Sequence, residues 1–302
     1  MTKVPVAILG SGNIGTDLMM KILKADGHLD LVLMAGIDPA SDGLKRAKEA
    51  GITTTAEGIN EVIDHGSVQI VFDATSAYSH IEHAKILKEK GIVAIDLTPA
   101  AIGPYVIPSI NIEEHINEMN INMVSCSGQA TTPLVYAVSQ IAEVLYSEII
   151  ATISSPSIGL GTRQNLDEFT ITTANAAKLV GGAQSARAMP VINAAEPPIL
   201  MNNTVYAVLE DDIDPVQLQK SVEDVVQKVK QYVPGYRLKG QPIVDERETP
   251  WGNRKVVIIM NEVEGAGDYF PKYAGNLDIM TAAALQVGEK IAENMLKGAA
   301  LK

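Results

Sequence analysis

Apolar positions in the first 100 residues fall into short strand-like runs separated by stretches with helical spacing. The runs cover residues 3–10, 29–38, 69–73 and 92–97, and residues 17–24 and 80–90 have apolar side chains spaced as on one face of a helix. Strands that alternate with helices are typical of a parallel sheet connected by right-handed crossovers. The pattern therefore predicts an α/β first domain.

The pattern changes after residue 147. Strand-like runs at 148–154, 204–209 and 255–263 are separated by helical stretches near 166–180 and 215–232, which predicts an α+β second domain. Residues 274–296 read as one helix with an apolar stripe that needs a surface to pack on. We expect that helix to return to the first domain. The predicted domains are 1–126, with 276–302 returning to it, and 127–275.

Composition narrows the functional classes. Of 302 residues, 46% are hydrophobic and 20% charged, the formal net charge is −12, and no apolar run approaches the roughly 20 residues that span a bilayer. Nucleic-acid binding is disfavoured because it needs clustered Lys and Arg. The first ten residues pass directly into a strand pattern without the features of a leader, so we expect a cytoplasmic protein without membrane contact.

A glycine-rich turn follows the first strand. Gly10, Ser11, Gly12, Asn13, Ile14 and Gly15 lie between that strand and a helix, and Asp38 closes the next strand 23 residues after the last glycine. In this context the glycines permit the turn, the approach of a pyrophosphate and close packing of helix on strand. Asp38 would accept hydrogen bonds from the adenosine ribose and so favour NAD over NADP. The sequence predicts a Rossmann domain that binds NAD, and the alternative is a glycine turn that binds nothing.

Cys126 is the only cysteine, so it is either a small buried apolar side chain or a reactive thiol. The helical pattern after it places the thiol near a helix N-terminus, where unpaired N–H groups favour the thiolate and lower its pKa. Next to an NAD domain, such a thiol suggests attack on an aldehyde, hydride transfer and a thioester. Backbone N–H groups near Ser127 and Gly128, or the amide of Asn165, are candidate oxyanion donors. The alternative is a non-catalytic NAD-binding scaffold with an inert cysteine.

The histidines do not supply an obvious base. All five precede Cys126, so none belongs to the second domain, and the base is a carboxylate, water or a weaker group. His80 and His83 have the spacing of a helical metal pair, but without evident further ligands we expect a solvated helix face and no metal. The glycine-bearing loop at 156–169 either shapes the nicotinamide pocket or is a surface turn with Asn165 as a helix cap.

Several stretches together resemble the acylating acetaldehyde dehydrogenases that act beside 4-hydroxy-2-oxovalerate aldolase in the meta-cleavage of aromatic compounds. The resemblance extends over nearly the whole chain, and its matching stretches are 10–18 (GSGNIGTDL), 36–44 (GIDPASDGL), 71–76 (VFDATS), 95–105 (IDLTPAAIGPY), 122–131, 161–169, 195–198 (AEPP), 232–239 (YVPGYRLK) and 273–281 (YAGNLDIMT).

The resemblance implies that Cys126 is the acyl-thioester nucleophile and that residues 11–14 hold the NAD pyrophosphate. It implies that the substrate is a short aldehyde such as acetaldehyde or propanal and that coenzyme A accepts the acyl group. It also implies homodimer contacts and a complex with the aldolase through an apolar patch of the second domain. It further implies that a set of residues lines the NAD and acyl site: Ser157, Gly159, Gly161, Thr162, Arg163, Asn165 and Asn276.

Two features bear on this resemblance. Asn203 stands where the family typically carries an Asp that is thought to help activate the thiol. The rival enzymes are phosphate-dependent semialdehyde dehydrogenases or reductases, which share the two-domain plan and the thiol. The absence of a histidine from the second domain speaks against these rivals.

Overall fold

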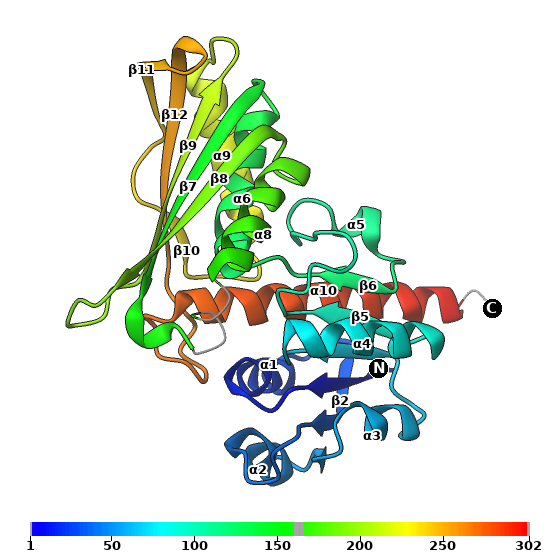
Figure 1. The fold of residues 1–302 in the computed structure, drawn as a ribbon. Coiled ribbons are helices and arrows are strands. Elements are labelled where there is room, and N and C mark those ends of the chain that lie inside the picture. Colours follow the sequence, from blue (N-terminus) through cyan, green and yellow to red (C-terminus); the bar gives the residue numbers. More distant parts are fainter. Residues whose placement is uncertain (1, 160–162, 164–165, 301–302) are drawn as a thin grey trace. The chain divides into compact units, whose positions relative to one another are not determined.

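The computed structural model describes residues 2–159, 163 and 166–300, and the chain divides into two compact units (Figure 1). The first unit comprises residues 1–123 and 280–302, and the second comprises residues 124–279.

The first unit is built on a parallel sheet of six strands in the order β3-β2-β1-β4-β5-β6. The order reverses between β1 and β4, which is the switch point at which α/β sheets of this type bind their ligands. Its elements are β1 (Val4–Leu9), α1 (Asn13–Lys24), β2 (Leu29–Ala35), α2 (Asp42–Glu49), β3 (Thr53–Thr55), α3 (Ile59–Asp64), β4 (Ile70–Asp73), α4 (Ala77–Glu89), β5 (Val93–Asp96), α5 (Ile112–His115) and β6 (Asn120–Asn122).

Both faces of this sheet are buried, which explains why its strands are continuous apolar runs. On one face, alternate residues such as Leu9 and Val71 pack with Val62 of α3 and Leu87 of α4. The strands therefore lie inside the unit, and their carboxyl ends and the following loops remain to form a binding edge.

The last helix, α10 (Gly275–Ala300), packs onto the first unit from residue 280 onward, as predicted. Gly288 lies so close to Phe72 that an added Cβ would come within 2.5 Å of its ring. The hydroxyl of Thr281 donates to buried Asp17 of α1, which also pairs with Lys21 at 2.9 Å. These contacts place α1 and α10 side by side and confirm the expected return of the C-terminal helix.

The described residues of the second unit form a mixed sheet and three long helices. The strand order is β10-β12-β9-β7-β8, with β11 paired to β12, and only the pair of β7 and β8 is parallel. Its elements are α6 (Cys126–Ser139), β7 (Val144–Ser154), the 3₁₀ turn η1 (Ser155–Ser157), α8 (Leu166–Leu179), β8 (Ala183–Asn193), β9 (Met201–Leu209), α9 (Pro215–Lys230), β10 (Tyr236–Leu238), β11 (Ile243–Thr249) and β12 (Gly252–Val263).

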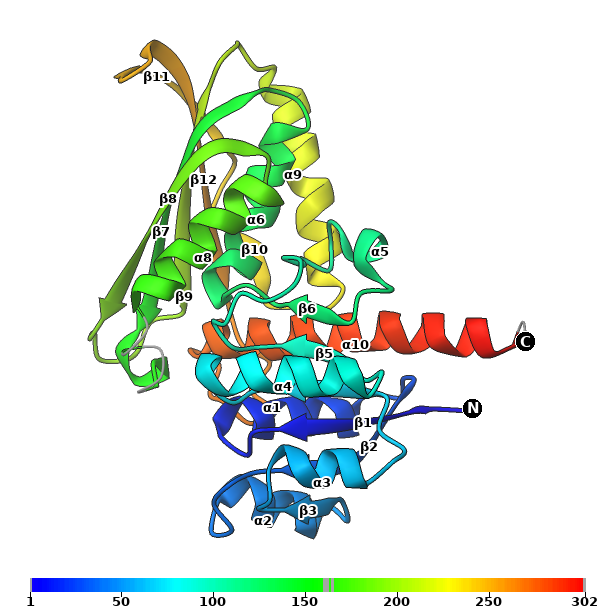
Figure 2. The same cartoon turned by 45° about the vertical axis from the view of Figure 1, so that its right-hand side comes forward.

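The helices α6, α8 and α9 cover one face of this sheet, and no helix in the described part of the unit lies on the other (Figures 1 and 2). Residues that point toward the helices, such as Ile149, Val205 and Ile259, are buried, whereas the adjacent residues Ile150, Thr204 and Met260 are partly exposed. The predicted α/β fold with an α+β second domain is therefore confirmed. Among the described residues, no helix is long and apolar enough to cross a membrane.

Candidate functional site

The glycine turn links β1 to α1. Gly10 has a φ of +110°, and a Cβ there would lie 2.6 Å from the carbonyl oxygen of Ala74. A Cβ on Gly15 would lie 1.9 Å from the carbonyl oxygen of Gly10. Gly12 caps α1, is exposed, and has nothing within 4 Å of the position of a Cβ. Gly10 and Gly15 are therefore required by the fold, whereas Gly12 leaves open space at a helix N-terminus, which fits a pyrophosphate.

Ser11 is held from the neighbouring loop. Its Oγ lies 2.8 Å from the donating hydroxyl of Ser41, which also caps α2. Gly43 approaches so closely that a Cβ would lie 2.2 Å from the carbonyl oxygen of Ser11. The loop after β2 thus fixes the glycine turn, while Asn13 is exposed and Ile14 is half-buried at the start of α1.

Asp38 lies in that same loop and not at a strand end. β2 ends at Ala35, three residues before the predicted bound, because the chain turns away at Gly36 and Asp38 is exposed. The Asp38 carboxylate accepts a hydrogen bond from the backbone N–H of Ala40 at 2.9 Å. One carboxylate oxygen is thereby held in place, and the other is available for a ligand hydroxyl.

Cys126 is the first residue of α6. Ser125 caps this helix, and its Oγ accepts from the N–H of Gly128 at 2.9 Å and lies 2.7 Å from the hydroxyl of Thr173 in α8. The N–H of Gly128 is therefore committed to the cap, which corrects its assignment as an oxyanion donor. The N–H groups of Cys126 and Ser127, in the first turn of the helix, remain donors of the right kind.

The environment of the thiol opposes ionisation. Removal of the sulfur from water raises the pKa of Cys126 to about 11, although the backbone N–H groups of Cys126 and Ser127 act in the opposite direction. The prediction of a lowered thiol pKa was wrong, because the desolvation exceeds the effect of the helix start. The residue keeps partial exposure. In the free protein this thiol is accordingly protonated at neutral pH.

The loop after β7 is braced by its own side chains. Arg163 donates to the carbonyl oxygens of Ile158 and Ser155, at 3.3 and 3.1 Å, and the hydroxyl of Ser157 donates to the carbonyl oxygen of Ser154 at 2.8 Å. The amide of buried Asn276 donates to the carbonyl oxygen of Ser157 at 3.3 Å. Arg163 is therefore a support of the loop, and exposed Gly159 is the point at which a ligand can approach its backbone.

Asn276 carries a further polar atom that points to a ligand. Its Oδ1 is buried and accepts no hydrogen bond within the part of the chain that the structure describes. Such an orphaned acceptor fits an amide or hydroxyl group of a bound molecule. Three other predicted site residues, Gly161, Thr162 and Asn165, lie outside the described residues.

Asn203 is buried on the helix-covered face of β9. Its amide donates to Oδ1 of Asn261 at 3.1 Å, and Asn261 in turn donates to the carbonyl oxygen of Ala130 in α6 at 3.3 Å. The hydroxyl of Tyr236 donates to the same carbonyl at 2.7 Å. A neutral amide pair thus supports the helix that begins with Cys126, at the position where the resemblance leads one to expect a carboxylate.

A second polar group, which the sequence analysis missed, lies in the first unit. His80 is fully buried and His83 is 15% exposed, and Nδ1 of each lies within 2.9 Å of the same carboxylate oxygen of Asp73. The expectation of a solvated helix face was therefore wrong, because this face of α4 packs against the end of β4. Among the residues that the structure describes, no cluster of three or more His, Cys, Asp or Glu could hold a metal.

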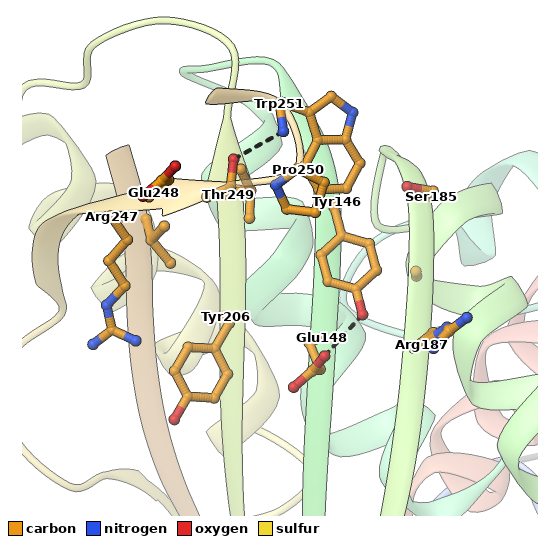
Figure 3. A pocket seen from close by; sticks show the side chains of 13 residues that line it. Tyr146, Glu148, Ser185, Arg187, Tyr206, Arg247, Glu248, Thr249, Pro250 and Trp251 are labelled. Carbon is orange, nitrogen blue, oxygen red and sulfur yellow. Dashed lines mark hydrogen bonds between the residues drawn. The ribbon is translucent and has the colours of Figure 1, made fainter. Parts of the chain in front are cut away.

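The open face of the second unit carries a groove of about 660 Å³. The ring of Trp251 stacks on that of Tyr146 with 5.6 Å between centroids, and the Tyr146 hydroxyl donates to Glu148 at 2.8 Å (Figure 3). Tyr206 stands on the neighbouring strand, and Arg187 and Arg247 lie on either side. The groove combines aromatic surface with charges of both signs.

Comparisons with known proteins agree with this arrangement. Residues 5–119 match the family described as semialdehyde dehydrogenase, NAD binding domain, and residues 126–271 match the family described as prokaryotic acetaldehyde dehydrogenase, dimerisation. The chain resembles an aspartate semialdehyde dehydrogenase II from Vibrio cholerae in fold, with a TM-score of 0.62 and 16% identity over 98% of this chain and 99% of that one.

Relatives of much higher identity are acetaldehyde dehydrogenases. That of Roseiflexus castenholzii is 57% identical over 97% of this chain and 96% of the relative. Those of Geobacillus genomosp. 3 and Thermus thermophilus are 58% and 55% identical, over 97% of this chain and 97% and 96% of the relatives. With its glycine turn and NAD-binding first unit, the chain is an NAD-dependent oxidoreductase that belongs to the acetaldehyde dehydrogenase family.

Proposed function

We propose that this enzyme oxidises acetaldehyde, or a similarly short aldehyde such as propanal, to acyl-CoA, with Cys126 as the covalent nucleophile. The observation that carries the proposal is the position of the only cysteine as the first residue of α6, beside N–H groups that the helix leaves unpaired. The first turn of such a helix supplies both a nucleophilic side chain and backbone N–H groups that can stabilise an oxyanion.

The proposed reaction begins when the sulfur of Cys126 adds to the aldehyde carbonyl, whose oxygen is stabilised by the N–H groups of Cys126 and Ser127. Bound NAD supplies the acceptor for the hydride that leaves the resulting thiohemiacetal carbon. Cys126 then holds the acyl group as a thioester. The thiolate of coenzyme A attacks this thioester, acyl-CoA leaves, and the sulfur of Cys126 is released as a thiolate.

The thiol must lose its proton at the start of this sequence. Its pKa of about 11 means that the sulfur is protonated when the aldehyde arrives. The second unit contains no histidine, and the neighbouring polar pair of Asn203 and Asn261 is neutral and cannot accept the proton. Water is therefore the proposed proton acceptor, and the thiolate is stabilised by the start of α6 while it attacks.

We propose that both units contribute residues that bind NAD. In the first, Gly10, Ser11, Gly12, Asn13, Ile14 and Gly15 hold the pyrophosphate and Asp38 holds the adenosine ribose. The second carries catalysis and dimerisation, and its residues Ser157, Gly159, Arg163 and Asn276 contribute to the NAD and acyl site together with Gly161, Thr162 and Asn165. The open space at Gly12 and the orphaned acceptor of Asn276 support this assignment.

For homodimer contacts we propose the open face of the second unit's sheet. Residues 126–271 match a family described by dimerisation, and this face carries half-exposed Met189 and Val191 beside the aromatic groove. Glu148 and Arg187 are paired in register on adjacent strands, so two copies related by a two-fold axis can match each charge with its opposite.

The resemblance to enzymes of aromatic meta-cleavage also supports a complex with 4-hydroxy-2-oxovalerate aldolase and a cytoplasmic location. Co-elution of the two purified proteins from a gel-filtration column tests the complex. Separate elution at concentrations well above those in the assay rejects it.

An absorbance assay distinguishes the proposed acyl acceptor from its rival. Enzyme, NAD and acetaldehyde are mixed with either coenzyme A or phosphate, and NADH formation is followed. We expect turnover that depends on coenzyme A and is indifferent to phosphate. Turnover that depends on phosphate and ignores coenzyme A identifies a phosphate-dependent semialdehyde dehydrogenase type of reaction and rejects the proposal.

A further inference from the structure

One carboxylate in the first unit holds an unusually large set of donors. Asp73 is the last residue of β4 and is fully buried. Its Oδ2 faces Nδ1 of His80 at 2.9 Å and Nδ1 of His83 at 2.8 Å, and its Oδ1 accepts from both the N–H and the hydroxyl of Thr75. These four contacts tie the end of β4 to the loop that follows it and to α4.

The geometry places a proton on Nδ1 of both imidazoles. An ionised carboxylate only accepts hydrogen bonds, so Nδ1 of His80 and Nδ1 of His83 must each carry a proton. Although burial alone would raise it, the hydrogen bonds from His80, His83 and Thr75 hold the pKa of Asp73 well below its usual range. Both imidazole nitrogens point at one oxygen at hydrogen-bond distance, which leaves no room for a metal between them.

The surroundings of His80 are polar on its other side. Its Nε2 lies 3.0 Å from the amide nitrogen of Asn120 on β6 and 3.4 Å from Oδ2 of Asp96 on β5. His80 is thus enclosed by groups from three strands, whereas His83 reaches the rim of the unit. This group contains more polar side chains than are needed to neutralise one buried carboxylate. The reaction proposed above does not use them.

The loop that Asp73 organises touches the glycine turn. The N–H of Ala74 donates to the carbonyl oxygen of Leu9 at 2.7 Å. The carbonyl of Ala74 occupies the space in which Gly10 would otherwise carry a Cβ. The position of residues 74–75 therefore limits the backbone conformation of Gly10. Gly10 begins the turn that leads to Gly12.

We propose that Asp73, His80 and His83 are positioning residues for NAD, which hold residues 74–75 against Gly10 and so keep the glycine turn in the conformation that receives a pyrophosphate. The proposal rests on the proposed role of that turn. None of the three residues needs to touch the cofactor, because their effect passes through the backbone of Ala74 and Gly10.

His83 gives the sharpest test because it lies at the rim and two substitutions differ in one property. The side-chain amide nitrogen of Asn lies about where Nδ1 of His lies, so His83→Asn keeps the donor to Asp73, whereas His83→Leu removes it. His65→Asn is the control, because His65 is partly exposed and its ring contacts Ser67 within its own loop. NAD affinity is measured by titration calorimetry, and KM values for NAD and acetaldehyde are measured separately.

We expect His83→Leu to weaken NAD binding about fivefold, which is what one net hydrogen bond is worth. The KM for NAD should rise in step while the KM for acetaldehyde stays unchanged, and His83→Asn and His65→Asn should bind NAD as the unaltered enzyme does. Asp73→Asn, which presents an amide N–H to two imidazole N–H groups, should have a larger effect if it folds.

Two results overturn the inference. One is unaltered NAD affinity in His83→Leu, and the other is equal weakening in His83→Asn and His83→Leu, which would show that the donor is not the cause. If the unaltered enzyme itself binds no NAD, the proposed function fails instead, so the two failures are distinguishable.

Discussion

At the scale of single residues, the state of the Cys126 thiol decides how the enzyme can work. The start of α6 favours the thiolate, but the desolvation of the sulfur outweighs it and leaves the pKa at about 11. A nucleophile that is protonated at rest is protected from adventitious alkylation and oxidation, since only the thiolate reacts. In the proposed reaction, the thiol therefore becomes reactive only when it loses its proton to attack the aldehyde.

This state predicts the pH profile of alkylation. Because the thiolate fraction rises with pH until the pKa is reached, iodoacetamide should react slowly at pH 7 and about tenfold faster for each pH unit up to pH 9. Cys126 is the only cysteine, so the mass of the intact protein reports its labelling without ambiguity. A rate that is already at its plateau below pH 8 contradicts the raised pKa.

A second residue-scale prediction concerns Asp96, which is fully buried at the end of β5. Burial raises its pKa to about 6, so the folded protein binds this proton more tightly than the unfolded chain does. The contribution of Asp96 to the free energy of unfolding therefore falls as the pH rises from about 4 to about 6, by about 1–3 kcal/mol in total.

Asp96→Asn removes that titration and keeps an oxygen for the N–H of Thr98, which Asp96 accepts at 2.7 Å. Relative to the unaltered protein, the variant should gain stability as the pH rises from 4.5 to 7.5. Urea unfolding at both values measures the difference. Two stability profiles that run parallel over this range refute the prediction.

At the scale of elements, the glycines of the turn between β1 and α1 meet two different requirements, close packing of the backbone and open space for a ligand. A side chain on Gly15 collides with the carbonyl of Gly10, whereas a side chain on Gly12 meets only open space. Gly15 serves the packing of α1 on β1, and Gly12 leaves the space in which we propose that the pyrophosphate binds. A pair of alanine variants can therefore distinguish loss of fold from loss of binding.

Gly12→Ala should leave the melting temperature unchanged and weaken NAD binding at least about tenfold, because its methyl group occupies the space of the pyrophosphate. Gly15→Ala should lower the melting temperature by several degrees or prevent folding. Differential scanning fluorimetry and NAD titration check the pair. A Gly12→Ala enzyme that binds NAD normally shows that the turn is not the pyrophosphate site.

The sequence predicted the elements that have two buried faces or one clear apolar stripe. The runs that became β1, β4, β5, β9 and β12 and the helices α4, α8, α9 and α10 were found within a few residues of their bounds. β8 was missed, because it is an edge strand with an irregular burial pattern and contains Pro190, which only an edge tolerates. The short strands β3 and β10 carry too few residues to show a period.

The geometry of the site could be predicted only in part, because it depends on contacts between residues that are far apart in the sequence. The local pattern predicted that Cys126 lies near a helix N-terminus, whereas the raised thiol pKa depends on surrounding atoms that no local pattern contains. The grouping of Asp73 with His80 and His83 could have been suspected, because a carboxylate at the end of an apolar strand is followed by two histidines on one helix face. Their shared oxygen becomes evident only when α4 is folded back on β4.

At the scale of the whole molecule, the second unit has a sheet face that α6, α8 and α9 leave uncovered (Figures 1 and 2). Met189 lies two residues after Arg187 on β8 and so shares the face that carries the groove. Its side chain is 46% exposed, which is unusual for a large apolar residue on a sheet and is explained if a second copy covers it.

Met189→Glu should therefore shift the enzyme from dimer to monomer, since a two-fold contact brings the new charge close to its own copy. Ile171→Glu is the matched control, because Ile171 is also exposed but lies on α8, which covers the opposite face. Light scattering during gel filtration gives both masses. The proposed interface is wrong if Met189→Glu elutes with the mass of the unaltered enzyme.

The half-reaction with acetyl-CoA shows whether Cys126 carries the acyl group. The enzyme is incubated with acetyl-CoA in the absence of NADH, quenched in acid, digested and examined by mass spectrometry. We predict one acetyl group on the peptide that contains Cys126, and none after the substitution Cys126→Ser under the same conditions. Acetylation elsewhere, or none on Cys126 in an enzyme that turns over acetaldehyde with coenzyme A, contradicts the account.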